Sequence, residues 1–539
     1  MGFYLNSNDS FSQYRDETAK PYFIDKTGML EELIPLVEQG GNNLCITRPR
    51  RFGKSTVATM IGSYFGRGID AHEVFDSLQI AEKPGYHEHL NQHNVIYIDF
   101  SKYDEECDNY RDYIGNIKEL LKEDLREAYP EVRFREKGSV GEDLKRIHQI
   151  TGERFIFVFD EWDCIFHKDF FTKRDRKSYV SFLANLTKGM GYVLFTYMTG
   201  VLPIAKYSQS DTLNNFMEYT MASQPMYNEY FGFTEGEVDD LYRRYCRICA
   251  QPSVTREDLS IWYDGYHTAA GTRMYNPRSV VYALTNNHLA SYWTGSGQYA
   301  EIAEYITGKT AKIEGLRDDV ILMAAGESVP ASVEEYAATA MNLSTKEEVF
   351  SAMVVYGFLN YENGYVRIPN KELMDEFSKT LRREKDYRYI LELERESKRL
   401  LEATIAGKTD VVEEVLEFVH NSESPLKAYN DEAELSGCIK LAYIAARDRY
   451  NIQREDQAGI GYVDYIFYPY DRKDPGIIIE LKVNATPEYA IGQIKEKKYA
   501  LKFKGKIGEK PKTEGQILAV GIAYKKKSKV YKCKIEVLS

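Results

Sequence analysis

The chain has 539 residues, of which 43% are hydrophobic, and a formal net charge of −12. This length suits three or four domains with cores of their own, and the negative charge excludes a protein that simply coats nucleic acid. No apolar run reaches the roughly 18 residues of a membrane span, no signal peptide is evident, and the seven cysteines are scattered, so we expect no membrane contact and a reducing, cytoplasmic location.

A loop that suits a phosphate group follows the first predicted elements. Residues 22–40 predict a short strand-like piece and then an amphipathic helix, and residues 44–47 predict a strand. A helix then opens at Gly53-Lys54-Ser55. A strand that enters a helix through a tight loop points backbone N–H groups and the positive end of the helix dipole at one spot. Lys54 would add a cation for the β and γ phosphates of a nucleotide, and Ser55 a hydroxyl for Mg²⁺.

The loop departs from the P-loop pattern G-x-x-x-x-G-K-[ST] at its first position. The first glycine falls at Arg48, so the loop entry must be built with an ordinary L-residue followed by Pro49. Because a short Gly-Lys-Ser match also occurs by chance, the assignment needs a second signal. If it holds, the residues expected to contact the nucleotide are Arg51, Phe52, Gly53, Lys54, Ser55 and Thr56.

The second signal is a pair of acids at a strand end. Apolar strands are predicted between helices at residues 94–100, 154–161 and 191–200. This alternation predicts an α/β fold with a parallel sheet covered on both faces, so Asp160 and Glu161 emerge at the edge where such sheets bind ligands. Asp160 would hold the Mg²⁺ bound to Ser55, and Glu161 would orient the attacking water. A solvated acidic turn is the alternative.

Two later residues are candidates for phosphate contacts. Thr199 ends the next apolar strand and would contact the γ phosphate, although a capping role is the alternative. Asn276 and Pro277 suit the cap and first turn of a helix, which places Arg278 at a helix start. An arginine there could reach a phosphate from a lid domain, or serve a structural or surface role.

Residues 345–378 predict a winged-helix-like unit. A helical run precedes a hairpin whose Asn363-Gly364 suits a type I′ turn, and a second helix follows. Such a unit either contacts DNA or packs on the nucleotide domain, and packing is the expectation here. Residues 387–419 are charged, helical and free of proline, so they predict a connector.

A second acidic site is predicted near the carboxyl end. Side chains alternate along a strand, so Glu480 and Lys482 share one face of the strand at residues 477–483. A hairpin partner would bring the carboxylate of Asp464 beside Glu480, and Mg²⁺ would relieve their repulsion. Lys482 could then orient a water or stabilise charge on a scissile phosphate. A chance E-x-K on a half-exposed strand is the alternative.

The segment after this strand is rich in lysine. Gln493 lies on a predicted helix at residues 488–503 and could face the same cavity. Residues 495–534 contain fourteen lysines, no arginine and three acids. This local positive charge would attract a phosphate backbone, or form a plain solvated face.

These motifs resemble two known domains. The strings YFIDKTGMLEELI, ITRPRRFGKST, FIFVFDEWD, YMTGVLPI, WYDGY and YNPRSV resemble the bacterial AAA-ATPase-like domain, in which arginine usually replaces the first P-loop glycine. The strings GYVDYIFYP, IIIELKV and AIGQIKEKKYA resemble its usual companion, a PD-(D/E)XK nuclease domain, with Val463 where proline is common.

The resemblance implies ATP-site roles for Lys54, Ser55, Asp160 and Glu161, and nuclease-site roles for Glu434, Asp464, Glu480, Lys482 and Gln493. Among the latter, Glu434, Asp464 and Glu480 would bind Mg²⁺. The expected organisation is a P-loop domain at residues 1–230, a helical lid with the winged-helix-like region at 231–385, a helical connector at 386–424 and a small α/β nuclease-like domain at 425–539.

The sequence thus predicts an ATP-binding and ATP-hydrolysing protein coupled to Mg²⁺-dependent cleavage of nucleic acid, with DNA the expected polymer. The nucleotide state would gate access to the carboxylate site. One alternative is an ATP-controlled signalling or assembly switch whose last domain only binds nucleic acid or a partner. Another is an inactive ATPase that keeps nucleotide as a structural cofactor. The oligomeric state stays open, with a homo-oligomer among the options.

Overall fold

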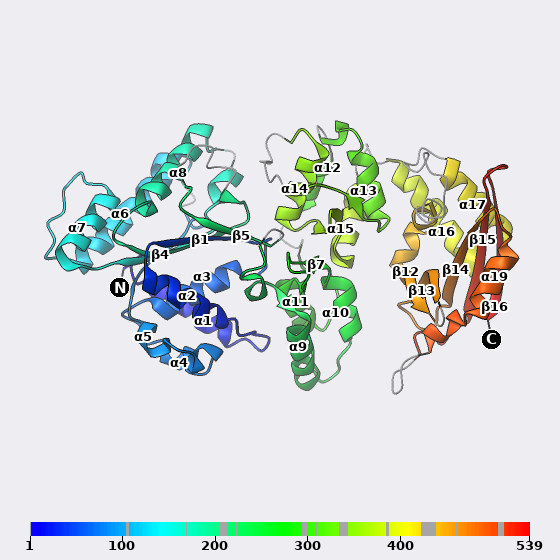
Figure 1. Ribbon diagram of the computed structural model, residues 1–539, viewed down its shortest axis with the longest axis horizontal. Coiled ribbons are helices and arrows are strands. Elements are labelled where there is room, and N and C mark those ends of the chain that lie inside the picture. Colours follow the sequence, from blue (N-terminus) through cyan, green and yellow to red (C-terminus); the bar gives the residue numbers. More distant parts are fainter. Residues whose placement is uncertain are drawn as a thin grey trace. The chain divides into compact units, whose positions relative to one another are not determined.

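The structure is a computed structural model that describes residues 2–103, 107–168, 170–204, 213–221, 224–293, 299–307, 310–333, 343–383, 388–421, 438–458, 461–504 and 511–538. The chain divides into two compact units (Figure 1). The first comprises Met1–Ser296, Ala331–Leu343 and Glu347–Glu372, and the second comprises Gly297–Pro330, Ser344–Lys346 and Leu373–Ser539. Within the described ranges, no helix is long and apolar enough to cross a membrane.

A five-stranded parallel sheet in the order β2-β3-β4-β1-β5 forms the centre of the first unit. Its strands are β1 (Asn42–Thr47), β2 (Asn94–Asp99), β3 (Phe155–Asp160), β4 (Val193–Gly200) and β5 (Met217–Thr220). Strand β4 lies between β1 and β3, so the carboxyl ends of all three strands meet at one edge. This confirms the predicted α/β sheet of a P-loop NTPase.

Helices cover both faces of this sheet, with α1–α5 on one side and α6–α8 on the other (Figure 1). They are α1 (Asn8–Thr18), α2 (Gly28–Gln39), α3 (Lys54–Phe65), α4 (His72–Phe75), α5 (Tyr86–His89), α6 (Tyr110–Ala128), α7 (Val140–Thr151) and α8 (Lys173–Thr187). Leu33 of α2 and Ile61 of α3 join Val158 of β3 in one buried apolar cluster. Phe157 and Phe159 of β3, which alternate with Val158, are also fully buried, so both sheet faces are dry, as the continuous apolar strands require.

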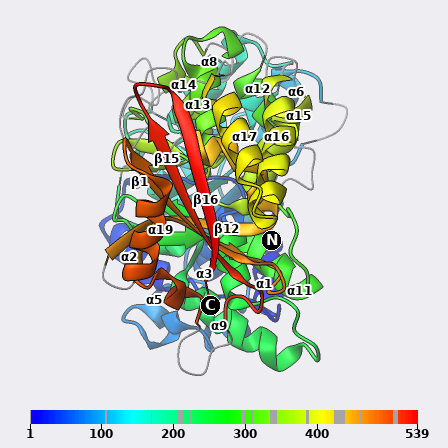
Figure 2. The same ribbon diagram turned by 90° about the vertical axis from the view of Figure 1, so that its right-hand side faces the viewer.

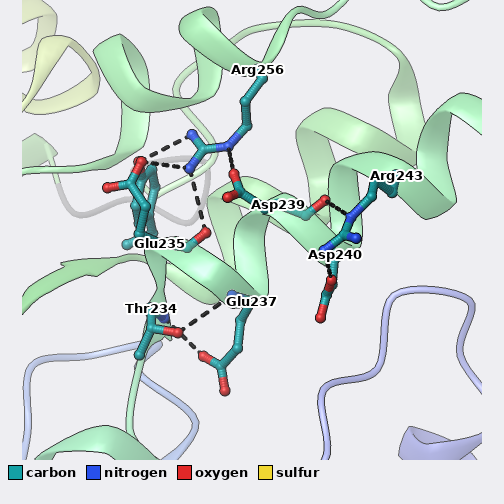
Figure 3. A network of polar contacts seen from close by, with 8 residues as sticks. Thr234, Glu235, Glu237, Asp239, Asp240, Arg243 and Arg256 are labelled. Carbon is teal, nitrogen blue, oxygen red and sulfur yellow. Dashed lines mark hydrogen bonds and ion pairs between the residues drawn. The ribbon is translucent and has the colours of Figure 1, made fainter.

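A smaller helical group follows the sheet in the chain. It contains α9 (Glu235–Ile248), α10 (Arg256–Tyr263) and α11 (Pro277–Asn286), with the short strands β6 (Phe233–Thr234), β7 (Tyr266–His267) and β8 (Arg273–Tyr275). Figure 3 shows Arg256 reaching Glu235 and Asp239 at the start of α9, with ion-pair distances of 2.8 and 2.6 Å. Its guanidinium also lies 5.3 Å from the ring centroid of Tyr275. This network ties α9 and α10 to the strand that leads into α11.

The predicted helix–hairpin–helix order is confirmed. It consists of α14 (Lys346–Tyr356), β10 (Asn360–Glu362), β11 (Tyr365–Arg367) and α15 (Lys371–Arg383). Asn363 and Gly364 have φ values of 50° and 84°, which is the left-handed pair that a type I′ turn needs. The hairpin packs within the first unit, where the side chain of Asn360 accepts a hydrogen bond from His267 N–H at 2.7 Å. This bond joins the hairpin to β7 of the helical group, and the expected packing on the nucleotide domain stays a prediction.

The second unit is built on a mixed sheet in the order β12-β13-β14-β15-β16. Its strands are β12 (Tyr450–Ala458), β13 (Gly461–Pro469), β14 (Gly476–Val483), β15 (Ile517–Lys525) and β16 (Val530–Leu538), and only the β14–β15 pair is parallel. Figure 2 shows β15 and β16 between α19 (Pro487–Glu496) on one side and α16 (Arg388–Ile405) and α17 (Thr409–Asn421) on the other. The unit also contains α12 (Tyr299–Ile306), α13 (Leu316–Ala324) and β9 (Val329–Pro330).

A glycine allows α19 to lie close to the sheet. A Cβ atom on Gly521 of β15 would fall 2.4 Å from the carbonyl oxygen of Pro487. Gly521 pairs with Glu480 across the parallel β14–β15 ladder, so α19 covers the face that carries Glu480.

Two predicted helices are shorter than expected. The connector breaks at Gly407, whose φ of 68° ends α16 before α17 begins. The helix predicted at residues 488–503 ends at Glu496, because Lys498 adopts a φ of 55° and a 3-10 turn follows at Tyr499–Phe503. In both places a left-handed residue stops the helix.

Candidate functional sites

The loop between β1 and α3 turns at two residues with left-handed backbone. Arg51 has a φ of 68° and Gly53, the residue before α3, a φ of 86°. The first backbone N–H groups of α3 are thus presented to the cavity described below. Lys54 is buried, and its Nζ donates a hydrogen bond to the carbonyl oxygen of Pro49 at 3.2 Å. The loop therefore has the donors and the cation that a phosphate needs.

Arg48, at the position of the missing glycine, has a structural role. Its buried guanidinium donates hydrogen bonds to Thr47 O, Tyr219 O and Asn228 Oδ1, each at 2.8 Å. Burial lowers the pKa of Arg48 to about 9. The group also lies 4.8 Å from the ring centroid of Phe231. Arg48 therefore links β1 to the last strand of the sheet, and the loop can turn at Arg51 and Gly53 without an initial glycine.

The acids at the end of β3 lie beside the loop. Asp160 is 1% exposed and its carboxyl group is hydrogen-bonded to the side chain of Ser55. Burial, followed by the charges of Asp99 and Glu161, raises the pKa of Asp160 to about 7. Burial also raises the pKa of Glu161, and the cation of Lys54 opposes this shift. The structure thus brings the predicted residues Ser55, Asp160 and Glu161 near the cation of Lys54. A hydroxyl with carboxylates suits Mg²⁺ beside a triphosphate.

Asp99 belongs to this group although sequence analysis assigned no role to it. It ends β2 and lies in register with Asp160 on β3. Its one signal in the sequence is the same as that of Asp160, an acid directly after an apolar strand.

Thr199 lies inside the sheet near these acids. It is fully buried, and its hydroxyl donates to the carbonyl oxygen of Ile46 on β1 at 2.9 Å. It does not line the cavity described below. The expected contact with a γ phosphate stays a prediction, and the bond to Ile46 gives this side chain a structural partner.

A cavity of about 590 Å³ opens beside the phosphate loop. Its walls come from four parts of the first unit, in chain order Tyr14, Glu17, Lys20, Pro21, Tyr22, Phe23, Ile24 and Lys26; Arg51 to Val57 with Met60; Glu161, Tyr230, Gly232 and Phe233; and Pro277, Arg278, Val281, Tyr282 and Thr285. This volume is typical of small-molecule sites. Cations and backbone donors at the loop, with aromatic and apolar walls elsewhere, suit a nucleoside triphosphate.

The aromatic part of this wall was not expected from the sequence. Tyr22 and Phe23 precede α2, and Tyr230 lies between β5 and β6, so no local motif joins them to the loop. Among the wall residues distant from the loop in sequence, only Glu161 and Arg278 were candidates. The missing information is tertiary, because the fold alone brings these segments together.

Arg278 lies in the first turn of α11, as predicted. Asn276 caps the helix by accepting a hydrogen bond from the N–H of Ser279 at 3.2 Å. The guanidinium of Arg278 lies 5.0 Å from the ring centroid of Tyr282, one turn later. Both side chains line the cavity. The cap and the aromatic ring therefore hold this cation at the cavity wall.

A buried carboxyl group fixes the same helix. Glu372 accepts hydrogen bonds from the hydroxyl of Ser279 at 2.8 Å and from the N–H groups of Tyr292 and Trp293 at 2.6 Å. Arg51 in turn donates to the carbonyl oxygen of Tyr292 at 2.9 Å. Glu372 therefore joins α11 to the loop that carries Arg51.

Three cations surround one end of the cavity. Burial, and next the neighbouring charge of Arg278, lowers the pKa of Arg51 to about 10. Lys54, on the same loop as Arg51, is the third of these cations and also lines the cavity. Cations held near one another repel, so an anion bound between them would be favoured.

The second site forms where β13 and β14 pair. Tyr465 lies opposite Ile479, so Asp464 and Glu480 are the next cross-strand neighbours and share one face. Asp464 Oδ2 accepts a hydrogen bond from the N–H of Leu481 at 2.7 Å. Glu480 Oε1 accepts one from Lys482 Nζ at 2.9 Å. The structure therefore brings Asp464, Glu480 and Lys482 together, as the sequence predicted.

The electrostatics of this site favour a bound cation. Glu480 is 2% exposed, and its Oε2 atom is buried without a hydrogen-bond partner among the described residues. Burial, and next the charge of Asp464, raises the pKa of Glu480, while Lys482 and Lys497 oppose this shift. A buried carboxylate oxygen with no partner beside a second carboxylate fits a hard cation such as Mg²⁺.

Of the two remaining candidates for this site, the structure describes Gln493 but not Glu434. Gln493 is half-buried on α19, one turn before Lys497, whose charge acts on Glu480. Glu434 lies outside the described residues. Within the residues that are described, no cluster of three or more metal-binding side chains occurs. Two carboxylates with waters are nonetheless a common Mg²⁺ set.

Part of the lysine-rich segment is neutralised by acids. Lys495 and Lys534 both pair with Glu536, the latter at 3.2 Å. Lys532 pairs with Glu413 of α17 at 2.7 Å. These lysines form the solvated face that was the alternative to a phosphate-binding surface.

Comparison with known proteins supports two domains. The AAA-ATPase-like family model, described as a predicted AAA-ATPase, matches residues 7–209, and the PD-(D/E)XK nuclease superfamily model matches residues 430–534. None of the curated proteins compared matches the sequence at a significant level.

Similar solved structures include three ATPases or origin-recognition proteins. The Walker-type ATPase PABY2304 of Pyrococcus abyssi is 12% identical with a TM-score of 0.36, and the match covers 66% of this chain and 96% of that chain. The ORC2 protein of Aeropyrum pernix, in its ADPNP-ADP complexes, is 10% identical with a TM-score of 0.31, covering 69% and 93%. Drosophila ORC bound to DNA is 10% identical with a TM-score of 0.26, covering 69% and 92%.

These structural likenesses are too weak to add to the two family matches, which agree with the P-loop sheet and with the mixed sheet described above. The chain therefore combines an AAA-ATPase-like domain at residues 7–209 with a carboxyl-terminal domain of the PD-(D/E)XK nuclease superfamily at residues 430–534.

Proposed function

We propose that this protein binds and hydrolyses ATP in its first unit and cleaves DNA with Mg²⁺ in its second. The observation that carries the nuclease proposal is the convergence of Asp464, Glu480 and Lys482, with the unpartnered oxygen of Glu480 buried among them. A structural strand pair would gain nothing from two adjacent carboxylates in a buried position, because each raises the cost of ionising the other.

At the ATP site, each residue has a task that its position supports. Lys54 would exchange the carbonyl of Pro49 for the β and γ phosphates. Ser55 and Asp160 would hold Mg²⁺, and Glu161 would orient the attacking water. Arg51 and Arg278 would balance phosphate charge from the other walls of the cavity, which they line.

At the nuclease site, Asp464 and Glu480 would hold Mg²⁺, with Glu434 proposed as a further ligand. The ion would polarise the scissile phosphate and lower the pKa of a bound water. In the reaction, a water oxygen bonds to phosphorus as one P–O ester bond breaks, and the proton lost by the water balances the proton gained by the leaving oxygen. Lys482, 2.9 Å from Glu480 Oε1, would orient that water or offset phosphate charge, and Gln493 would hold substrate or water.

The test is cleavage of duplex DNA, single-stranded DNA and RNA by the purified full chain, with Mg²⁺ or with EDTA. We expect Mg²⁺-dependent fragments from DNA. Protein that hydrolyses ATP and changes oligomeric state, but cuts none of these polymers, would overturn the nuclease proposal in favour of an ATP-controlled assembly switch.

The proposed coupling between the sites needs its own test. We expect ATP to change the rate of DNA cleavage by the wild-type protein and to leave the rate of the Lys54→Ala variant unchanged. An equal response of both proteins to ATP would show that the nucleotide site does not control cleavage.

A further inference from the structure

The hairpin between β15 and β16 carries four lysines at its tip. Lys525, Lys526, Lys527 and Lys529, with Ser528, form five consecutive exposed residues, which we call the lysine tip. Within the described residues, no acidic side chain pairs with any of these lysines. The tip is therefore a compact and uncompensated positive charge.

The lack of acidic partners among the described residues distinguishes the tip from other lysines of the same segment. Lys495, Lys532 and Lys534 pair with Glu536 or Glu413, as described above. A lysine whose charge is already balanced gains less from a phosphate than an unbalanced one. The segment thus contains two kinds of lysine, which sequence composition alone cannot separate.

The tip is fixed to the strand that carries the acidic site. Asn484, just after β14, donates its N–H to Tyr524 O at 2.8 Å, and its Oδ1 accepts the N–H of Lys526 at 3.1 Å. Asn484 has a φ of 56°, a left-handed conformation that asparagine tolerates. The end of β14 and the beginning of the tip are therefore held together by two hydrogen bonds.

The register gives the distance between the tip and the site. Glu480 pairs with Gly521, and Lys525 follows four residues later on the same strand. At about 3.3 Å per residue, the tip begins roughly 13 Å beyond the level of Glu480. Residues 521, 523 and 525 alternate onto one face, so Lys525 starts out on the face of Glu480.

We propose that the lysine tip binds the phosphodiester backbone of the nucleic acid that is cut at Asp464 and Glu480. This inference rests on the proposed nuclease function and names the surface that holds its substrate. With about 3.4 Å of rise per base pair, the contact would lie about four base pairs from the cut. Lysines bind phosphate as point charges, so this anchor would be independent of sequence and sensitive to salt.

The experiment compares two variants that lose the same charge. The tip variant K525Q/K526Q/K527Q removes three uncompensated lysines, and the control variant K495Q/K532Q/K534Q removes three paired ones. Affinity for a fluorescent 20-base-pair duplex is measured by anisotropy in EDTA, at salt concentrations between 50 and 200 mM. Thermal unfolding of both variants checks that the fold is intact.

We expect the tip variant to bind at least about tenfold more weakly at the lowest salt. Its slope of log affinity against log salt should be shallower by up to about 2.7, at about 0.9 for each lost phosphate contact. The control variant should keep the wild-type slope and lose no more than about threefold. Equal losses in the two variants would overturn the inference, because they would reflect net charge alone. Wild-type protein that binds anionic vesicles but no duplex would also overturn it.

Cleavage separates this inference from the proposed function. If the wild-type and tip-variant proteins cut and bind DNA equally well, the proposed role of the tip is wrong and the nuclease function is still supported. A wild-type protein that never cuts DNA, yet loses duplex affinity through the tip mutations, would overturn the nuclease function and keep the tip as a nucleic-acid contact.

Discussion

One oxygen of Asp464 accepts a hydrogen bond from the backbone N–H of Leu481 at 2.7 Å. The bond joins β13 to β14 one residue beyond Glu480, and so fixes the spacing of the two carboxylates. Strand alternation then leaves Lys482 on the same face, within 2.9 Å of Glu480. A backbone contact therefore positions a site that the sequence shows only as two separate strings.

Lys482 can be tested apart from the carboxylates. We expect Lys482→Gln to slow Mg²⁺-dependent cleavage by about 100-fold or more, the usual cost of losing one group that stabilises transition-state charge. The rate is measured with saturating duplex DNA under single-turnover conditions. Lys532→Gln, in the same unit, is the control and should cut normally. A Lys482→Gln rate near that of the wild type would assign this lysine a structural role only.

If Lys54 binds the phosphates of ATP, the stability that ATP adds to the protein should depend on this residue. ATP with Mg²⁺ at 100 times its Kd should stabilise the wild-type protein by about 2.7 kcal/mol. Because Lys54 lines the cavity, Lys54→Ala should remove most of this gain. Lys83, which is half-buried and does not line the cavity, is the control, and Lys83→Ala should keep the gain. Thermal unfolding with and without ATP measures both. A wild-type Tm that does not change when ATP is added would argue against any nucleotide role.

Because Arg48 has a structural role, we expect that replacing it with the glycine of the P-loop consensus lowers the stability of the fold. Arg48→Gly removes three hydrogen bonds at 2.8 Å and leaves the carbonyl groups of Thr47 and Tyr219 without this donor. We expect a loss of about 2–4 kcal/mol in the free energy of unfolding, since buried acceptors of a charged donor are left unpaired. Urea unfolding measures it. If Arg48→Gly were neutral, the proposed link between β1 and β5 would be wrong.

Glu372 predicts a pH dependence of stability. Burial raises its pKa from the ordinary 4.5 to about 7, against the hydrogen bonds it accepts and the charge of Arg51. Between these values the folded protein holds a proton that the unfolded chain has lost. The stability from this group is therefore complete below about pH 4 and is lost as pH rises towards 7, by at most about 1.4 kcal/mol per unit.

Glu372→Gln keeps an acceptor for Tyr292 and Trp293 but cannot titrate. The variant should gain stability relative to the wild type as pH rises from 5 to 7, and the difference should level off above 7. Urea unfolding at pH 5, 6, 7 and 8 gives this difference directly. A constant difference across all four values would mean that Glu372 titrates normally.

The elements of the sheet could be read from the sequence because each signal is local. The apolar runs at residues 94–100, 154–161 and 191–200 became β2, β3 and β4, and Asn363-Gly364 became the expected turn. Asn276 and Pro277 likewise began α11. Periodicity, capping and turn chemistry act over a few residues, so they can be recognised in the sequence without knowledge of the fold.

Longer-range relationships could not be read in the same way. Nothing near Arg48 indicates that its partners are Tyr219 and Asn228, some 170 to 180 positions later in the chain. The position of β4 between β1 and β3, and the aromatic wall with Tyr22, follow from packing alone. In the second unit, composition predicted a basic face, but only the folded structure shows which lysines are balanced, such as Lys532 by Glu413 and Lys534 by Glu536.

The most direct measurement is the release of DNA fragments by the wild-type and Glu480→Gln proteins in Mg²⁺. We expect DNA fragments from the wild type in Mg²⁺ and none in EDTA. Cleavage by Glu480→Gln should be slower by about 100-fold or more, with unchanged duplex affinity and unchanged stabilisation by ATP. Cleavage by Glu480→Gln at the wild-type rate would contradict the proposed nuclease function.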